Sequence, residues 1–118
     1  MSHKVAIASS DGKFVNQHFG RANQFLIVEL KDDGTYEFLE LRKNVPSCNP
    51  TGESTTGDTI ELISDVEAVL VSQVGPGAAN KLSAHGIQPI IIPMLIDEAM
   101  KKIYELIQEE SEEEDLQS

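Results

Sequence analysis

The stretch Glu67-Ala68-Val69-Leu70-Val71-Ser72 decides the fold class, because a turn and a second apolar run, 87–93, follow it. Apolar runs of this length bounded by turn residues are typical of buried strands. The turn Gly75-Pro76-Gly77 is expected to open a helix that ends near His85, since Pro76 suits a first helical turn and Gly86 suits a helix end. A strand, a helix and a strand in succession imply parallel strands joined by a right-handed crossover.

Three further strands are expected before this unit, at 4–9, 24–31 and 35–42. The turn Asp32-Asp33-Gly34 between the last two is a hairpin signal, which predicts that they pair antiparallel. Helices are expected at about 57–64 and from Ile96 to about Glu110, where apolar residues recur on one helical face. The predicted fold is therefore a three-layer α/β domain with a mixed five-stranded sheet and helices on both faces.

The chain of 118 residues has the length of one domain, with a net charge of −11. Residues 109–118 carry six acids and no base, and without them 14 acids face 9 bases, a net charge of −5. We expect one domain over residues 1–108 and a disordered acidic tail over 109–118.

An acidic chain without a basic stripe repels a phosphate backbone, so nucleic acid is not expected as a partner. No apolar run approaches the ~20 residues that cross a bilayer, and the N-terminus lacks the pattern of a signal peptide. We therefore expect a cytoplasmic protein without a membrane partner.

The chain has a single cysteine, Cys48, within the long polar loop 44–57. One thiol cannot form an internal disulfide, and an iron–sulfur cluster normally takes about four. A cluster bound here must take ligands from elsewhere or be held loosely. No serine-hydrolase or zinc-protease motif is present, so no enzymatic activity is expected.

Ligands of open α/β sheets gather at the carboxyl ends of the strands, where polar loops lie in this sequence. An imidazole and a thiolate suit transition metals, and a glycine turn at a helix start favours an anion. Each has a structural alternative: a histidine can cap a loop, a cysteine can be inert, and the glycines can form only a tight turn. The candidate binding residues are His18, Arg21, Cys48, Gly75 and Gly77, with His18 and Cys48 as metal ligands. Lys81 could add positive charge, whereas His85 at a helix end is expected to be structural.

One segment reads Asn16-Gln17-His18-Phe19-Gly20-Arg21-Ala22, preceded by Asp11-Gly12 and followed by Phe25-Leu26-Ile27. With the Cys48 loop, 68–78 and 86–89, it resembles the dinitrogenase iron–molybdenum cofactor biosynthesis family, which includes NifX and the C-terminal domain of NifB. The resemblance extends from Lys4 to about Ile107. The acidic tail departs from the family pattern.

The resemblance implies a ribonuclease H-like fold without nuclease activity, and binding of the iron–molybdenum cofactor or its iron–sulfur precursor. His18 matches the family histidine and Cys48 matches a cysteine of many members. Metallocluster donor and acceptor proteins are then the expected partners of a carrier that is a monomer or homodimer. The alternative is a regulatory module that binds a partner protein or a small anion without metal.

Overall fold

The computed structural model describes residues 3–43 and 56–117, with α/β architecture. The predicted order of elements is confirmed, with boundaries that differ by a few residues. The elements are β1 (His3–Ala8), η1 (Phe19–Arg21), β2 (Gln24–Leu30), β3 (Tyr36–Lys43), α1 (Thr56–Leu62), β4 (Ala68–Val71), α2 (Pro76–Ala84), β5 (Gln88–Ile91) and α3 (Ile96–Gln117).

The five strands form one mixed sheet in the order β3-β2-β1-β4-β5. The hairpin strands β2 and β3 pair antiparallel, β1 and β2 also pair antiparallel, and β4 lies parallel to both β1 and β5. The chain leaves β1 toward β2 on one side, and leaves β4 toward β5 on the other. The carboxyl ends of β1 and β4 therefore flank a topological switch point, where open α/β sheets bind their ligands.

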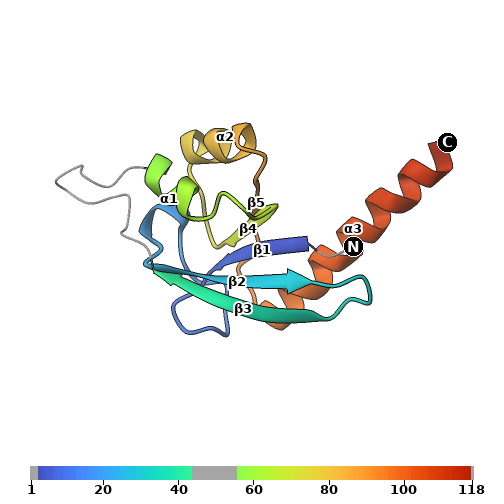
Figure 1. The fold of residues 1–118 in the computed structure, drawn as a ribbon, viewed down its shortest axis with the longest axis horizontal. Coiled ribbons are helices and arrows are strands. Elements are labelled where there is room, and N and C mark those ends of the chain that lie inside the picture. Colours follow the sequence, from blue (N-terminus) through green and yellow to red (C-terminus); the bar gives the residue numbers. More distant parts are fainter. Residues whose placement is uncertain (1–2, 44–55, 118) are drawn as a thin grey trace.

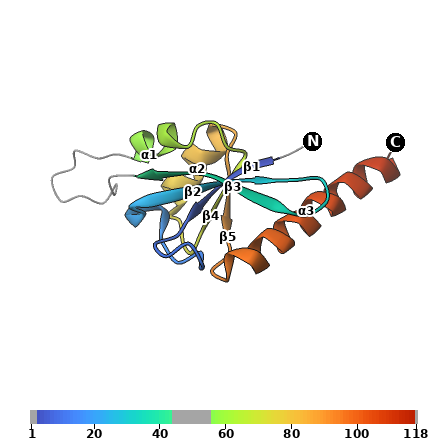
Figure 2. The same ribbon diagram turned by 60° about the horizontal axis from the view of Figure 1, so that its bottom comes forward.

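Two apolar cores lie on opposite faces of the sheet, as predicted, with α1 and α2 on one face and α3 on the other (Figures 1 and 2). Alternate strand residues supply the two cores, so Ala6 and Ala8 of β1 face α1 and α2 while Val5 and Ile7 face α3. From the helices, Ile60 of α1 and Leu82 of α2 pack in the first core, and Met100 of α3 packs in the second.

The turn residues act as the sequence predicts. Gly34 has φ +90° in the β2–β3 hairpin, where its N–H donates to Lys31 O at 3.0 Å. Gly86 has φ +78° just beyond α2, and its N–H donates to Ser83 O at 3.0 Å. A left-handed backbone favours glycine because a Cβ is strained there. His85 has the structural place predicted for it, with Nδ1 2.8 Å from Lys81 O.

Helix α3 is longer than the sequence predicted. Its backbone continues to Gln117, whereas the helix was expected to end near Glu110. The disordered tail expected over residues 109–118 stays a prediction. Residues 109–117 contain neither proline nor glycine, and glutamate is a good helix former, so nothing in the sequence terminates the helix. A domain boundary at residue 108 stays a prediction. No helix among the described residues is long and apolar enough to span a membrane.

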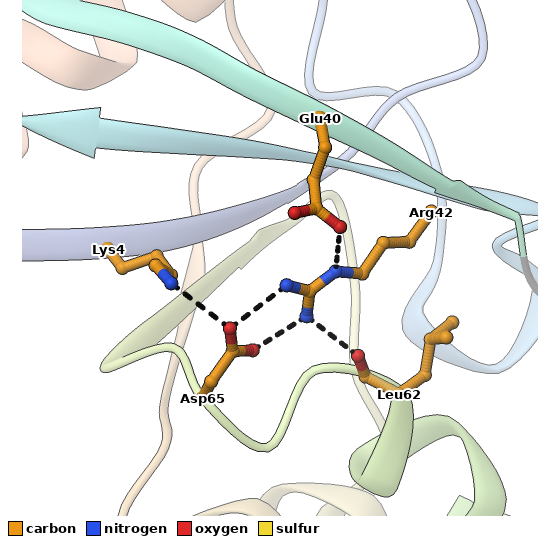
Figure 3. A network of polar contacts seen from close by, with 5 residues as sticks. All are labelled: Lys4, Glu40, Arg42, Leu62 and Asp65. Carbon is orange, nitrogen blue, oxygen red and sulfur yellow. Dashed lines mark hydrogen bonds and ion pairs between the residues drawn. The ribbon is translucent and has the colours of Figure 1, made fainter.

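A polar network on the α1 side of the sheet joins β3 to the turn after α1 (Figure 3). Arg42 of β3 binds Asp65 in a bidentate pair, with Nη1–Oδ1 at 2.6 Å and Nη2–Oδ2 at 2.9 Å. Arg42 also donates to Leu62 O and to Glu40, while Lys4 Nζ donates to Asp65 at 3.2 Å. The guanidinium holds the pKa of Asp65 well below its usual range. The network therefore fixes the edge strand to the layer of helices.

Replacement of Asp65 by asparagine is expected to lower the free energy of unfolding by about 1 kcal/mol near pH 7, because the pair is partly solvent-screened. An aspartate with a lowered folded pKa stabilises the protein above its unfolded pKa of ~3.9, and this stabilisation is lost as pH falls through the folded pKa. The difference between wild type and Asp65→Asn should therefore shrink below about pH 4. Urea unfolding followed by circular dichroism measures the free energy of unfolding of the wild type and of the variant at each pH.

Glu37→Gln is the matched control, since Glu37 makes an exposed ion pair with Lys31 at 3.5 Å. Its effect should stay below about 0.5 kcal/mol at either pH. An Asp65→Asn loss of the same size near pH 7 and near pH 3 would contradict the assigned role of the Arg42 pair.

Candidate functional site

Residues 17–19 form a short bridge across the carboxyl ends of β1 and β4. Gln17 N–H donates to Ala8 O at 3.3 Å, and Ser72 N–H donates to Gln17 O at 3.0 Å. His18 then pairs with Gln73 in a parallel bridge, in which Phe19 N–H donates to Gln73 O at 2.9 Å. The switch point of the sheet is thereby spanned by backbone that carries His18.

The loop before this bridge is held by its own side chains. Asp11 Oδ1 accepts the backbone N–H groups of Lys13 and Phe14 at 2.8 and 3.1 Å, an Asx turn that lowers the pKa of Asp11. Ser10 and Asn16 bond to each other across the loop, with Ser10 N–H donating to Asn16 Oδ1 at 3.0 Å. The polar residues after β1 therefore have a structural function, which brings His18 to a defined place.

Phe19 anchors the bridge and turns its neighbour outward. The Phe19 side chain is buried beneath η1, with its ring centroid 6.0 Å from that of Phe25. His18 precedes it with extended backbone and is exposed. The imidazole makes no capping hydrogen bond to η1, so the capping alternative raised from the sequence does not apply to that helix. The ring is displayed at the surface.

An open pocket of about 370 Å³ lies beside His18. Its described lining is His18, Gly20, Arg21, Gln73, Val74, Gly75 and Pro76. The volume falls within the range of small-ligand sites. One wall comes from the loop after β1 and the other from the loop after β4, so the pocket belongs to the switch point.

The electrostatics of this pocket suit an anion. Arg21 is the one charged residue in the described lining and no carboxylate accompanies it, although the whole chain has a net charge of −11. Gly75 is the N-cap of α2 and Pro76 its first residue. The N–H groups of a first helical turn and the helix dipole both favour negative charge.

Three of the five candidate residues, His18, Arg21 and Gly75, come together in this pocket. Gly77 lies in the first turn of α2 and is not part of the described lining. Cys48 lies outside the described residues. Lys43, the last described residue before that segment, pairs with Gln24 at the same end of the sheet.

Lys81, which the sequence suggested as a further cation, is in the last turn of α2 and away from the described lining. Gln73, Val74 and Pro76 line the pocket although the sequence did not single them out as ligand residues. The carboxyl end of β4 was the available signal for them. The pairing of Gln73 with His18 is a long-range contact that no local pattern reveals.

The side chains in the described part of the chain do not form a cluster that could hold a metal ion by itself. No group of three or more His, Cys, Asp or Glu side chains with a suitable arrangement occurs among residues 3–43 and 59–108. The buried Gln17 Oε1, next to His18, has no hydrogen-bond partner among the described residues. The pocket therefore offers one imidazole, one guanidinium and backbone N–H groups, a set that favours negative charge.

Several characterised proteins contain a segment similar to this chain. The sequence is 38% identical over 104 residues to the FeMo cofactor biosynthesis protein NifB of Frankia alni, covering 84% of this chain and 20% of that protein. It is 34% identical over 92 residues to the protein NifX of Azotobacter vinelandii, covering 74% of this chain and 54% of NifX. The chain thus spans about a fifth of NifB and about half of NifX.

Solved structures share the fold. The crystal structure of PH0822 superposes with a TM-score of 0.62 at 21% identity, covering 86% of this chain and 88% of that one. A crystal structure from Methanocaldococcus jannaschii gives 0.58 at 19% identity, covering 89% of this chain and 90% of that one. At these identities the likeness establishes the architecture.

The family itself is established by sequence. The family model described as "Dinitrogenase iron-molybdenum cofactor" matches residues 1–106, which include both walls of the pocket and every strand of the sheet. With the sequence motif around His18 and the two similar proteins, this match means that the chain belongs to the dinitrogenase iron–molybdenum cofactor family.

Proposed function

We propose that this protein is a non-enzymatic carrier that binds the iron–molybdenum cofactor, or an iron–sulfur precursor of it, and passes it to an acceptor. The single observation that carries the proposal is the pocket that joins His18 to Arg21 and the start of α2. Metallocluster donor and acceptor proteins would be its partners in the cytoplasm. The ribonuclease H-like classification is part of the same proposal.

The proposed cargo is an anionic metal cluster, and each part of the pocket has a matching role. The exposed His18 imidazole would bind a metal atom at the cluster surface, since imidazole suits iron and other transition metals. Arg21 and the first turn of α2 would attract the negative charge. Because exposed charges are screened by salt, binding should weaken as ionic strength rises.

Cys48 would supply a thiolate as the second metal ligand. The chain from Lys43 to Cys48 is five residues long and can span at most ~17 Å. Strand spacing puts β3 ~10 Å from β1, so the covalent chain permits the sulfur to reach the His18 side of the sheet. The chain length therefore allows Cys48 as a ligand but does not by itself favour it.

A small number of protein ligands suits a carrier. A cluster held by about four thiolates is a resident cofactor, whereas one imidazole and one thiolate leave most of the metal surface open. An acceptor protein can then attach its own ligands before the carrier releases the cargo. Differences in affinity between related complexes reside mainly in the dissociation rate, and a fast rate is what transfer requires.

Replacement of His18 by alanine should lower the affinity for isolated iron–molybdenum cofactor by about tenfold or more, because a metal ligand is lost. Replacement of Arg21 by glutamine should lower it by about two- to fivefold and reduce its salt dependence. Anaerobic titration followed by absorbance and electron paramagnetic resonance measures both, and the resonance should change only where His18 is replaced.

His85→Ala is the matched control, because this histidine is also exposed but lies at the far end of α2. It should bind the cofactor as the wild type does. If the double variant His18→Ala, Cys48→Ala also binds as the wild type does, the pocket is not the cluster site.

The alternative function is a module that binds a partner protein or a small anion without metal. The anion-favouring pocket supports this reading too, because it needs no metal ligand. Removal of residues 109–118 discriminates between them. A carrier should keep its cluster affinity in the titration, since the pocket is untouched. A module that works through the acidic segment should show no cluster binding even as the full chain. Its truncated form should no longer bind the partner protein in a binding assay.

A further inference from the structure

The two edges of the sheet differ in how well they are closed. At the β5 edge, Gln88 N–H donates to Glu67 O and Ile92 N–H donates to Val71 O, both at 2.9 Å. The backbone N–H and C=O groups of the even-numbered residues of β5 therefore point toward β4. The backbone of Pro89 points away from β4 and has no N–H to donate. An outward proline on a short edge strand opposes further pairing.

The β3 edge is longer and has no proline. Lys31 N–H donates to Thr35 O at 2.8 Å at the start of the hairpin. Alternation along an antiparallel ladder then directs the backbone groups of Tyr36 and Phe38 away from β2. The register shifts between Val28 and Ile27 and leaves Leu39 without a partner on β2, after which Leu41 and Lys43 face outward. No described strand lies against this edge.

Apolar side chains are exposed along the same edge. Phe38 is 54% exposed and Leu41 is 43% exposed. Their partners on β2 are Val28 and Leu26, which belong to or pack against the core beneath α3, so Phe38 and Leu41 lie on one face of the sheet. An edge strand that presents free backbone groups beside exposed apolar side chains is a template for pairing with another strand.

We propose that two copies of this chain pair antiparallel through β3, with Phe38 of one copy opposite Leu41 of the other. The same register sets Tyr36 of one copy opposite Lys43 of the other. Each residue whose backbone groups point away from β2 then meets a residue of the partner strand whose backbone groups also point away from β2. Because of the unpaired Leu39, Phe38 and Leu41 remain on the same face. The result is one continuous sheet through two domains.

The charges of β3 select the antiparallel arrangement. The strand has the acidic Glu37 as its second residue and ends with the basic Arg42 and Lys43. Antiparallel pairing in this register brings Glu37 of one copy opposite Arg42 of the other, whereas parallel pairing aligns like charges. Glu40 lies near the two-fold axis, so the Glu40 carboxylates of the two copies come close and repel each other. Arg42 Nε, 2.7 Å from Glu40 of the same copy, offsets this repulsion.

This dimer keeps the two cargo pockets apart. β2 and β1 separate β3 from β4, whose loop forms a wall of the pocket. Antiparallel pairing also sends the carboxyl ends of the two β3 strands in opposite directions. Each copy therefore keeps its own site, and the contact does not depend on cluster binding. A contact limited to one strand is small, so a reversible dimer is expected.

Sedimentation equilibrium of the full chain tests the pairing over a range of ~10 μM to ~1 mM. The wild type should shift from monomer toward dimer as concentration rises. Phe38→Glu alone and Leu41→Lys alone should stay monomeric, because each homodimer would place a charge opposite an apolar side chain twice. Both side chains are exposed, so unchanged circular dichroism and thermal unfolding are expected.

A mixture of the two variants tests the register. Phe38→Glu opposite Leu41→Lys makes one Glu–Lys pair and leaves one Phe–Leu pair intact, so the mixture should regain a heterodimer. A mixture of Phe38→Glu with Leu39→Lys is the matched control and should form no more heterodimer than a mixture of Phe38→Glu with the wild type. A wild type that is monomeric throughout overturns the proposal. Equal recovery with Leu39→Lys, or no recovery with Leu41→Lys, overturns the register.

Discussion

The backbone hydrogen bonds that fasten residues 17–19 across the ends of β1 and β4 are the constraint on which the candidate site depends. They make one pocket out of two loops that are distant in sequence, because Gln17 bonds to Ala8 and Ser72 while Phe19 bonds to Gln73. Backbone bonds alone do not set a register. The buried Phe19 does so, and by filling the core it leaves its neighbour His18 at the surface.

Much of the fold could be predicted from the sequence because its signals are local. The hairpin follows from Asp32-Asp33-Gly34, where Gly34 adopts a left-handed φ, and the ends of α2 follow from Pro76 and Gly86. The extension of α3 was missed because a run of acidic residues is typical both of solvated tails and of helices built from good helix formers. Composition does not separate these two states.

The candidate site was predictable in part, and the limit has a physical reason. The rule that ligands gather at the carboxyl ends of parallel strands predicted His18, Arg21 and Gly75 as ligand residues. These three residues meet in one pocket. The pairing of His18 with Gln73 depends on the position of β1 beside β4, which only the assembled sheet determines. The Arg42–Asp65 pair is likewise a contact between polar residues far apart in sequence, without a motif to announce it.

The arrangement separates tasks that would otherwise compete. A carrier needs an exposed site from which cargo can leave, yet exposed loops lose precision unless rigid elements hold them. Here the middle of the sheet supplies the rigidity, through β1 and β4 buried on both faces, and the loops add only a few ligand groups. In the proposed carrier, cargo would occupy the ends of the central strands and leave the lateral edge of β3 to other contacts. A partner at that edge would then bind without displacing the cargo, because no residue of β3 belongs to the described lining of the pocket.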